Sequence, residues 1–428
     1  MSSGSTVLLT VSESGTPAAR SYAFTIMING QTLDDRTLSP VESQELGEVS
    51  GQYQMLFDQS RRSKTTDYLE ILGSGLFHLF FENVWGQIKI KASDDKIRLA
   101  IASDIPKVLN LPWEIVQPPD GEVLGLDPAF SILRLPGQLE ALPQFKGQLP
   151  PGPLRVVFVA CSPRQSIDYL REEESFAKAL ERLDVAWDSC DLGTYEELKK
   201  RVDEFEPQIV HLVGQEVVKD GNNYFAFEGD SGLADLRSSV DIQRALPGVQ
   251  LVLFSGFQGK NPSILANLGI ELVKADMAMA MNWPGSIADG ESAIRAFYED
   301  LASGNTLYRA NASMRRKIMD VNKKGTVLLA FPTLYCRTDQ DRTFDPQQRA
   351  VLPGPLLVRQ PPQLSMTEGY SENFVGRKRE LQRLVPALRE GRVKTVIITG
   401  PVGSGKSTLA VRLAREPRIS RILHCRCF

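Results

Sequence analysis

The sequence predicts an α/β protein whose main part is a mostly parallel β-sheet with helices on both faces. From Leu154 onward, near-continuous apolar runs alternate with amphipathic segments, the pattern of buried parallel strands joined by helices. A glycine-rich stretch, Gly400–Ser407, separates a further apolar run from a further amphipathic segment. The chain has 428 residues, which is enough for two or three domains. We expect an α+β region, the α/β domain, a Pro-rich linker and the start of a phosphate-binding domain, at residues 1–150, 151–340, 341–372 and 373–428.

The composition is that of a globular protein and excludes several function classes. Hydrophobic residues make up 42% and charged residues 24% of the chain, which are ordinary values for a packed core. The net charge of −3 gives no overall attraction to nucleic acids or anionic membranes. No apolar stretch approaches the roughly 20 residues of a membrane helix, and the first residues lack the features of a signal peptide. Five cysteines without metal-ligand spacing fit a reducing compartment, so we expect a cytoplasmic protein.

The first 150 residues mix strand and helix signals. Apolar alternation predicts paired strands at 6–14 and 21–28. Apolar residues at helical spacing predict helices at 39–57, where Ser39-Pro40 is a good start, and at 67–81. Period-two alternation on both sides of Asp94-Asp95 predicts a hairpin formed by residues 87–93 and 96–103, and short extended pieces are expected at 110–116 and 130–136.

Residues 151–340 give the clearest α/β pattern. Buried strands are expected at 154–161, 185–190, 208–214, 249–256 and 277–283. Helices are expected between them at 169–183, 194–205, 262–273 and 290–304. The charged segments 171–175 and 314–324 are expected to face solvent. Ligands of such sheets bind at the carboxyl ends of the strands, so the residues after 208–214 and 249–256 carry most information about function.

The stretch Gly400–Ser407, "GPVGSGKS", matches the phosphate-binding pattern G-x-x-x-x-G-K-[ST]. It lies between an expected buried strand, "TVIIT", and an expected helix, "STLAVRLAR". Backbone amides would surround the phosphates of ATP, Lys406 would reach the β- and γ-phosphates, and the Ser407 hydroxyl would bind Mg²⁺. The predicted nucleotide-binding residues are Gly400, Gly403, Ser404, Gly405, Lys406, Ser407 and Thr408.

Hydrolysis of ATP needs more than this loop. A later strand must supply an acidic residue, and only about twenty residues follow Thr408. We therefore expect ATP and Mg²⁺ to be cofactors, and NTPase activity to exist, only if the chain continues beyond Phe428. From Asn373 to Phe428 there are 13 Lys/Arg and 3 Asp/Glu residues. We interpret this excess as the surface of a phosphate-binding domain that is cut short, rather than as a nucleic-acid-binding arm.

The segment around this loop resembles the entry to the nucleotide-binding domain of STAND-class NTPases, the NACHT/NB-ARC-like signalling switches. The resemblance rests on a V-G-R-x-x-E-L helix before the loop, here Val375, Gly376, Arg377, Glu380 and Leu381, and on the loop itself. It covers about 50 residues. It implies assembly that is controlled by nucleotide, with oligomerisation through this region.

Histidine is the residue most often used as a catalytic base, and the chain has three. His78 is expected on the apolar face of a helix, and His424 lies near the end of the chain. His211 lies within the strand 208–214, where we interpret it as a core histidine bonded to a backbone group. The alternative, a peptidase that uses Cys161 or Ser255 with His211, stays open.

Residues from about 110 to 336 resemble a CHAT domain, which has a caspase-like fold. The similar segments are "LPWEIV", "FSILRLP", "VVFVACSP", "PQIVHLVGQ", "VQLVLFSGFQG", "MAMAMNW", "AIRAFYEDLASG" and "FPTLY". In that family a histidine that follows the third strand is the catalytic base, and a cysteine after the next core strand is the nucleophile. The matching positions here are Gln215 and Gly256. Glutamine cannot take up a proton near neutral pH and glycine has no thiolate, so the resemblance implies a degenerate dyad and a pseudopeptidase.

The leading hypothesis is a catalytically inactive CHAT-like module of a STAND-type signalling ATPase, which binds a protein or peptide partner and neither nucleic acid nor membrane. One alternative is the unconventional peptidase described above. Another is a self-contained ATP-binding scaffold that depends on Lys406. For that scaffold we expect weak or no ATP binding by these 428 residues, because half of a nucleotide pocket is missing.

Overall fold

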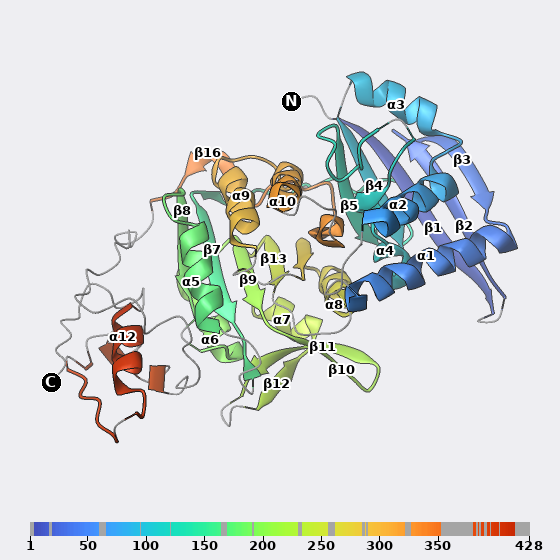
Figure 1. The fold of residues 1–428 in the computed structure, drawn as a ribbon. Helices are drawn as coiled ribbons and strands as arrows, with labels where there is room; N and C mark the ends of the chain where they lie inside the picture. The colour runs from blue at the N-terminus through green and yellow to red at the C-terminus, as the bar shows by residue number, and fades with distance from the viewer. Residues whose placement is uncertain are drawn as a thin grey trace.

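An eleven-stranded sheet forms the centre of the protein, in the order β3-β2-β1-β4-β5-β15-β14-β13-β9-β7-β8. The computed structural model describes residues 4–351 and separate stretches between 380 and 415. Within 4–351 the gaps are 17–18, 60–65, 95, 120, 164–168, 191, 230–232, 256–261, 285–286, 288–289 and 322–326. Figure 1 shows helices packed along the sheet. The predicted class, an α/β protein with a large, mostly parallel sheet flanked by helices, is confirmed.

One half of the sheet comes from the first 136 residues. Its strands are β1 (Ser5–Thr16), β2 (Ala19–Ile28), β3 (Gln31–Thr37), β4 (Ile97–Ser103) and β5 (Phe130–Pro136). β1 pairs with β2 in antiparallel fashion and with β4 in parallel, and β4 pairs in parallel with β5. The helices α1 (Pro40–Gln59) and α2 (Thr66–Phe80) form where they were predicted. Ser39 caps α1, since its hydroxyl accepts a hydrogen bond from the Glu42 amide at 3.2 Å.

Two predictions for this half are wrong. Residues 87–93 do not form a hairpin strand but lie in the helix α3 (Trp85–Asp94). Ile88 and Ala92 pack inward from it with Val84, at a spacing of four residues, whereas Ile90 is 66% exposed. The expected extended piece at 110–116 contains a turn of 3-10 helix, η1 (Trp113–Ile115), after the short helix α4 (Pro106–Leu109).

The other half of the sheet follows the predicted α/β pattern. Its strands are β7 (Leu154–Ala160), β8 (Val185–Ser189), β9 (Ile209–Val213), β13 (Leu251–Ser255), β14 (Met279–Trp283) and β15 (Thr333–Cys336). The first five run parallel to one another, and β15 is antiparallel to its neighbour β14. The helices are α5 (Tyr169–Ala179), α6 (Tyr195–Phe205), α7 (Ser239–Arg244), α8 (Pro262–Lys274), α9 (Glu291–Ala302), α10 (Leu307–Val321) and the 3-10 turn η3 (Val327–Ala330). One hydrophobic core extends through both halves, from Val7 to Phe344.

Two small sheets were not predicted. β10 (Glu216–Lys219), β11 (Asn222–Glu228) and β12 (Ala234–Arg237) form an antiparallel meander. β16 (Asp345–Arg349) pairs with β6 (Pro151–Gly152). The expected linker 341–372 therefore begins with a strand that pairs with β6, and its residues 352–372 lie outside the described part of the chain.

The charged segments are less exposed than predicted. Glu172 and Glu173 of α5 are 5% and 4% exposed. The Glu172 carboxylate accepts a hydrogen bond from the Ile287 amide at 2.7 Å, and that of Glu173 accepts one from the Ser189 hydroxyl at 2.8 Å. The segment 314–324 also buries apolar residues and an arginine of α10, namely Met314, Arg315 and Ile318. In contrast, His78 is not on the buried face of α2 but is exposed and pairs with Glu82.

A buried ion pair joins η1 to β5. Glu114 and Arg134 are both fully buried, and the two guanidinium Nη atoms lie 2.6 Å from the two carboxylate oxygens. Arg134 also donates to the carbonyl oxygens of Leu109 at 2.6 Å and Leu111 at 3.0 Å. Arg315 of α10 approaches the same carboxylate at 3.5 Å. Burial lowers the pKa of Arg315 to about 10, while Glu114 opposes this shift and Arg134 adds to it.

We expect Arg134→Ala to lower the free energy of unfolding by about 3–5 kcal/mol, because the carboxylate of Glu114 loses its bidentate partner while it stays out of water. Denaturant unfolding followed by circular dichroism measures the change. Arg349→Ala is the matched control, since Arg349 makes a bidentate pair with Asp184 in which both side chains are exposed. The control should leave the unfolding midpoint nearly unchanged. Equal losses in the two variants would contradict the importance of the buried pair.

Candidate functional site

The carboxyl ends of β7, β9 and β13 meet at one edge of the sheet, which we call the carboxyl edge. Val213 lies opposite Ser255 in the register of β9 and β13, and the Gly214 amide donates to the Ser255 carbonyl at 3.1 Å. Gln215 comes next and is partly buried, with its carbonyl oxygen accepting from the Ala226 amide of β11 at 2.9 Å. Gly256 lies outside the described residues, so the prediction for that position stays a prediction.

His211 lies in the core beneath this edge. Its Nε2 atom is 2.6 Å from the Ser255 hydroxyl, and its Nδ1 atom is 2.9 Å from the Tyr298 hydroxyl of α9. The expected position in the core is observed, but the partners are side-chain hydroxyls and not a backbone group. Phe158 and Phe176 contact the imidazole ring edge-on, so apolar rings surround the rest of it.

The Tyr298–His211–Ser255 chain has the connectivity of a nucleophile, a base and an orienting group, but its environment opposes catalysis. His211 is 0% and Ser255 1% exposed, so the serine hydroxyl is not accessible to a peptide carbonyl. Burial lowers the pKa of His211 to about 3 and raises the pKa of Tyr298 well above its ordinary value. A histidine that stays neutral at pH 7 and bonds two hydroxyls joins β9, β13 and α9 within the core.

The sequence paired Ser255 with His211 only in the alternative of an unconventional peptidase, and the leading interpretation gave His211 a backbone partner instead. The two residues are 44 positions apart, and only the pairing of β9 with β13 brings them together. Leu253 lies opposite His211, so Ser255, two residues further along, projects to the same face of the sheet. Knowledge of the strand order would have been the signal.

Cys161 also lies at the carboxyl edge, directly after β7. It is fully buried, and its amide donates to the Val213 carbonyl at 2.7 Å. Phe158, and not Cys161, lies opposite His211 in the register of β7 and β9. The placement fits the interpretation of Cys161 as a packing residue better than that of a nucleophile beside a base.

Glu216, the residue after Gln215, was not singled out from the sequence. Both of its carboxyl oxygens are buried without a hydrogen-bond partner in the described part of the chain. Burial, and then the charge of Glu271 on α8, raise the pKa of Glu216 to about 9, so the carboxyl is protonated at neutral pH. The indole N–H of Trp283, whose backbone pairs with Ser255 in register, likewise lacks a partner among the described residues. Buried polar groups without partners are rare and often mark functional sites.

The Gly400–Ser407 stretch leads directly into a helix. Gly403 and Gly405 both have φ of 79°, a conformation that favours glycine, and α12 (Lys406–Arg415) follows as predicted. The Lys406 ammonium donates to the carbonyl oxygens of Gly400 at 2.9 Å and Pro401 at 2.8 Å. Leu409 and Leu413 of α12 pack with Leu381 and Leu388 in a small separate cluster.

The prediction of a buried strand before this loop is wrong. Residues 395–400 belong to no strand, and Ile397 is 82% exposed. A phosphate-loop strand is buried when other strands pair with it on its sheet. No described residue pairs with 395–400, so the side chain of Ile397 has nothing to cover it.

The comparisons with known proteins bear on the larger part of the chain. A family model described as the CHAT domain matches residues 70–345, a range that includes η1, β9, β13 and the carboxyl edge. No curated protein matches the chain. None of the helices within the described ranges is long and apolar enough to cross a membrane.

We expect Glu216→Gln to change how stability depends on pH. The pKa of Glu216 is about 9 in the folded chain against an ordinary value of 4.5, so between these pH values unfolding releases a proton. The contribution of Glu216 is therefore full below pH 4.5 and is lost as the pH rises toward 9. Relative to wild type, Glu216→Gln should be more stable at pH 8 than at pH 5 by about 1–3 kcal/mol, as measured by denaturant unfolding. The exposed Glu48→Gln serves as the control, and a pH-independent difference would contradict the burial of a protonated carboxyl.

Proposed function

Because the chain belongs to the CHAT domain family, we propose that it is a catalytically inactive, caspase-like module that binds a protein or peptide partner. The observation that carries the proposal is the chemistry of the carboxyl edge, where a glutamine follows β9 and the only described histidine nearby is enclosed in the core. The resemblance assigns the base position to Gln215 and the nucleophile position to Gly256. An amide cannot accept a proton near neutral pH, and glycine supplies no thiolate.

The remaining nucleophiles at this edge do not replace the dyad. The Ser255 hydroxyl bonds the neutral imidazole of His211 inside the core, and Cys161 is fully buried. Hydrolysis would require a substrate carbonyl to approach within about 3–3.5 Å of one of these atoms. Their burial supports the absence of peptidase activity.

Partner binding is supported by the polar groups that are left without partners. The protonated carboxyl of Glu216 can donate and accept hydrogen bonds, and the Trp283 indole can donate one. Both groups are buried, so the alternating donors and acceptors of an extended peptide backbone would satisfy them only after the carboxyl edge opens. A caspase-like fold that has lost hydrolytic activity would in this way still bind a peptide.

The C-terminal unit is proposed to be the start of a STAND-type NTPase domain. The conformations of Gly403 and Gly405 and the helix that begins at Lys406 support a loop able to surround phosphates. Ser407 and Thr408, at the start of α12, would complete the site with Mg²⁺ and ATP in a complete domain. The nucleotide bound to that domain would then control assembly. The inactive caspase-like module would act as the sensor, adaptor or effector of the ATPase.

A second candidate is a peptidase that uses Ser255 with His211, because the 2.6 Å contact is within the range of a nucleophile and its base. Its active site would have to open to solvent. The two candidates differ in whether a substrate-like reagent can reach position 255.

We expect no covalent labelling of Ser255 or Cys161 in folded wild-type protein by serine-directed or thiol-directed peptide probes, with the labelled residue identified by mass spectrometry. The variant Gln215→His/Gly256→Cys should gain thiol labelling at position 256, because it restores a base and a thiol at the positions that the family uses. Gly256→Cys alone, without a base, should react more slowly, by about 100-fold for the loss of general-base assistance.

Two further samples complete the probe experiment. Unfolded wild-type chain is the control for access, since its Cys161 should react with a thiol reagent once it is exposed. Cleavage of a peptide library by wild-type protein that Ser255→Ala abolishes would replace the pseudopeptidase with the serine peptidase.

For nucleotide, we expect no saturable Mg-ATP binding at the Gly400–Ser407 loop of the 428-residue chain up to about millimolar concentration, which corresponds to about −4 kcal/mol. Isothermal titration calorimetry should therefore give the same Mg-ATP binding for wild type and for Lys406→Ala. The loop alone supplies only part of the contacts that a nucleotide needs. Micromolar binding that Lys406→Ala abolishes would support a self-contained ATP-binding scaffold instead.

A further inference from the structure

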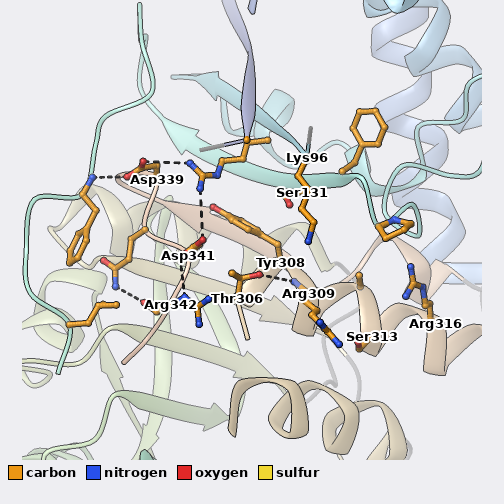
Figure 2. Close-up of a pocket in the computed structure, with 18 residues that line it drawn as sticks. Lys96, Ser131, Thr306, Tyr308, Arg309, Ser313, Arg316, Asp339, Asp341 and Arg342 are labelled. Carbon is orange, nitrogen blue, oxygen red and sulfur yellow. Dashed lines mark hydrogen bonds and ion pairs between the residues drawn. The ribbon is translucent and has the colours of Figure 1, made fainter. Parts of the chain in front are cut away.

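A pocket of about 730 Å³ lies at the amino ends of β4 and β5, away from the carboxyl edge. Its walls come from the starts of these strands, from α10 and from residues 339–342 after β15. Figure 2 shows Lys96 reaching into it from the strand side, while Arg309 and Arg316 lie along α10 on the other side. The volume is within the range of pockets that bind small molecules. We call it the basic pocket.

The lining of the basic pocket carries an excess of positive charge. It contains five basic and two acidic side chains. The two carboxylates are already engaged, because Asp339 and Asp341 lie 3.6 Å and 3.8 Å from the guanidinium of Arg98. Asp341 also lies 4.0 Å from Arg342. These pairs leave Lys96, Arg309 and Arg316 as the cations that set the character of the pocket.

These three cations are accessible and incompletely neutralised. Lys96 is exposed and has no ion pair within the described ranges. Arg316 is exposed too, and the hydrogen bond recorded for it goes from Nη2 to the neutral carbonyl oxygen of Leu126 at 3.1 Å. Arg309 contacts Asp300 through Nε at 3.2 Å, a contact that leaves its terminal Nη groups for another acceptor. All three line the same pocket, Lys96 from the strand side and the two arginines from α10.

The other lining groups define the kind of anion. Hydroxyls of Ser131, Thr306 and Ser313 border the pocket and can donate hydrogen bonds. Tyr308 also lines it, and its buried hydroxyl has no partner among the described residues. Arginine forks and hydroxyls together suit the several acceptor oxygens of a phosphate better than a single carboxylate. Two aromatic residues, Phe130 and Phe145, also line the pocket; the Phe130 ring is stacked on Trp85, which leaves Phe145 as the ring available to a ligand.

We propose that the basic pocket binds a phosphate-bearing small molecule with an aromatic or apolar ring. Lys96, Arg309 and Arg316 hold the phosphate, and Phe145 contacts the ring. The site is separate from the Gly400–Ser407 loop and from the carboxyl edge, since no described residue of either lines it.

The test uses the full 428-residue chain carrying Lys406→Ala, without divalent metal, so that the glycine-rich loop does not contribute. Titration calorimetry with inorganic pyrophosphate should show saturable binding to one site that weakens as the salt concentration rises. Lys96→Glu and Arg316→Glu should each weaken it by about tenfold or more, because each removes a charged hydrogen bond and adds repulsion. The side chains of Lys96 and Arg316 are exposed, so the two variants should fold.

Lys219→Glu is the matched control, because Lys219 is an exposed lysine on β10 that does not line the pocket. It should leave the affinity within about twofold, as expected for a distant, screened charge. Adenosine 5′-monophosphate should bind more tightly than inorganic phosphate, and Phe145→Ala should remove that advantage. Three results would overturn the proposal: no saturable binding at millimolar pyrophosphate, binding that Lys96→Glu and Arg316→Glu do not change, or an acidic peptide that binds more tightly than every phosphate compound.

Discussion

The ion pair between Glu114 and Arg134 is the constraint on which the rest of the fold depends. Arg134 lies opposite Tyr335 where β5 pairs with β15, and β15 is paired on its other side with β14. The ion pair is therefore located where the two halves of the sheet join. Two charges removed from water are tolerated only when their remaining donors and acceptors are satisfied. The carbonyl groups of Leu109 and Leu111 meet that requirement. The segment before η1 and strand β5 must therefore keep one relative position.

The sequence was sufficient to predict those helices and strands in which the buried residues recur at a single regular spacing. Buried parallel strands such as β9 and β13 are apolar except for His211 and Ser255, and helices such as α9 repeat apolar residues every three to four positions. The prediction failed where the apolar residues fit both the two-residue spacing of a strand and the spacing of a helix. Residues 87–93 alternate like a strand, yet the helical stripe formed with Val84 packs on the core and decides the outcome. The dipeptide Asp220-Gly221 is a sequence signal that could have predicted the β10–β11 hairpin. In the structure it forms the turn, with φ of 52° and 77°.

For the candidate site, the sequence could identify positions but not environments. Gln215 follows β9 at the carboxyl edge as predicted, and His211 lies in the core. Its hydroxyl partners come from β13 and α9, which are distant in the chain, so no local pattern could have shown them. The buried roles of Glu172 and Glu173 were missed for the same reason, since their partners, Ile287 and Ser189, become neighbours only in the folded chain.

Helix α10 connects the ion pair to the basic pocket. Arg309 and Arg316 are seven residues apart, two helical turns, so they lie on the same face of α10. Arg315, on the adjacent face, approaches Glu114 and donates to the carbonyl oxygen of Pro332. A phosphate held by Arg309 and Arg316 would thus bind a helix that is already fixed to the core. Its binding is expected to stabilise the folded chain by mass action without moving α10. At this end of the sheet, as at the carboxyl edge, the role that we propose is recognition.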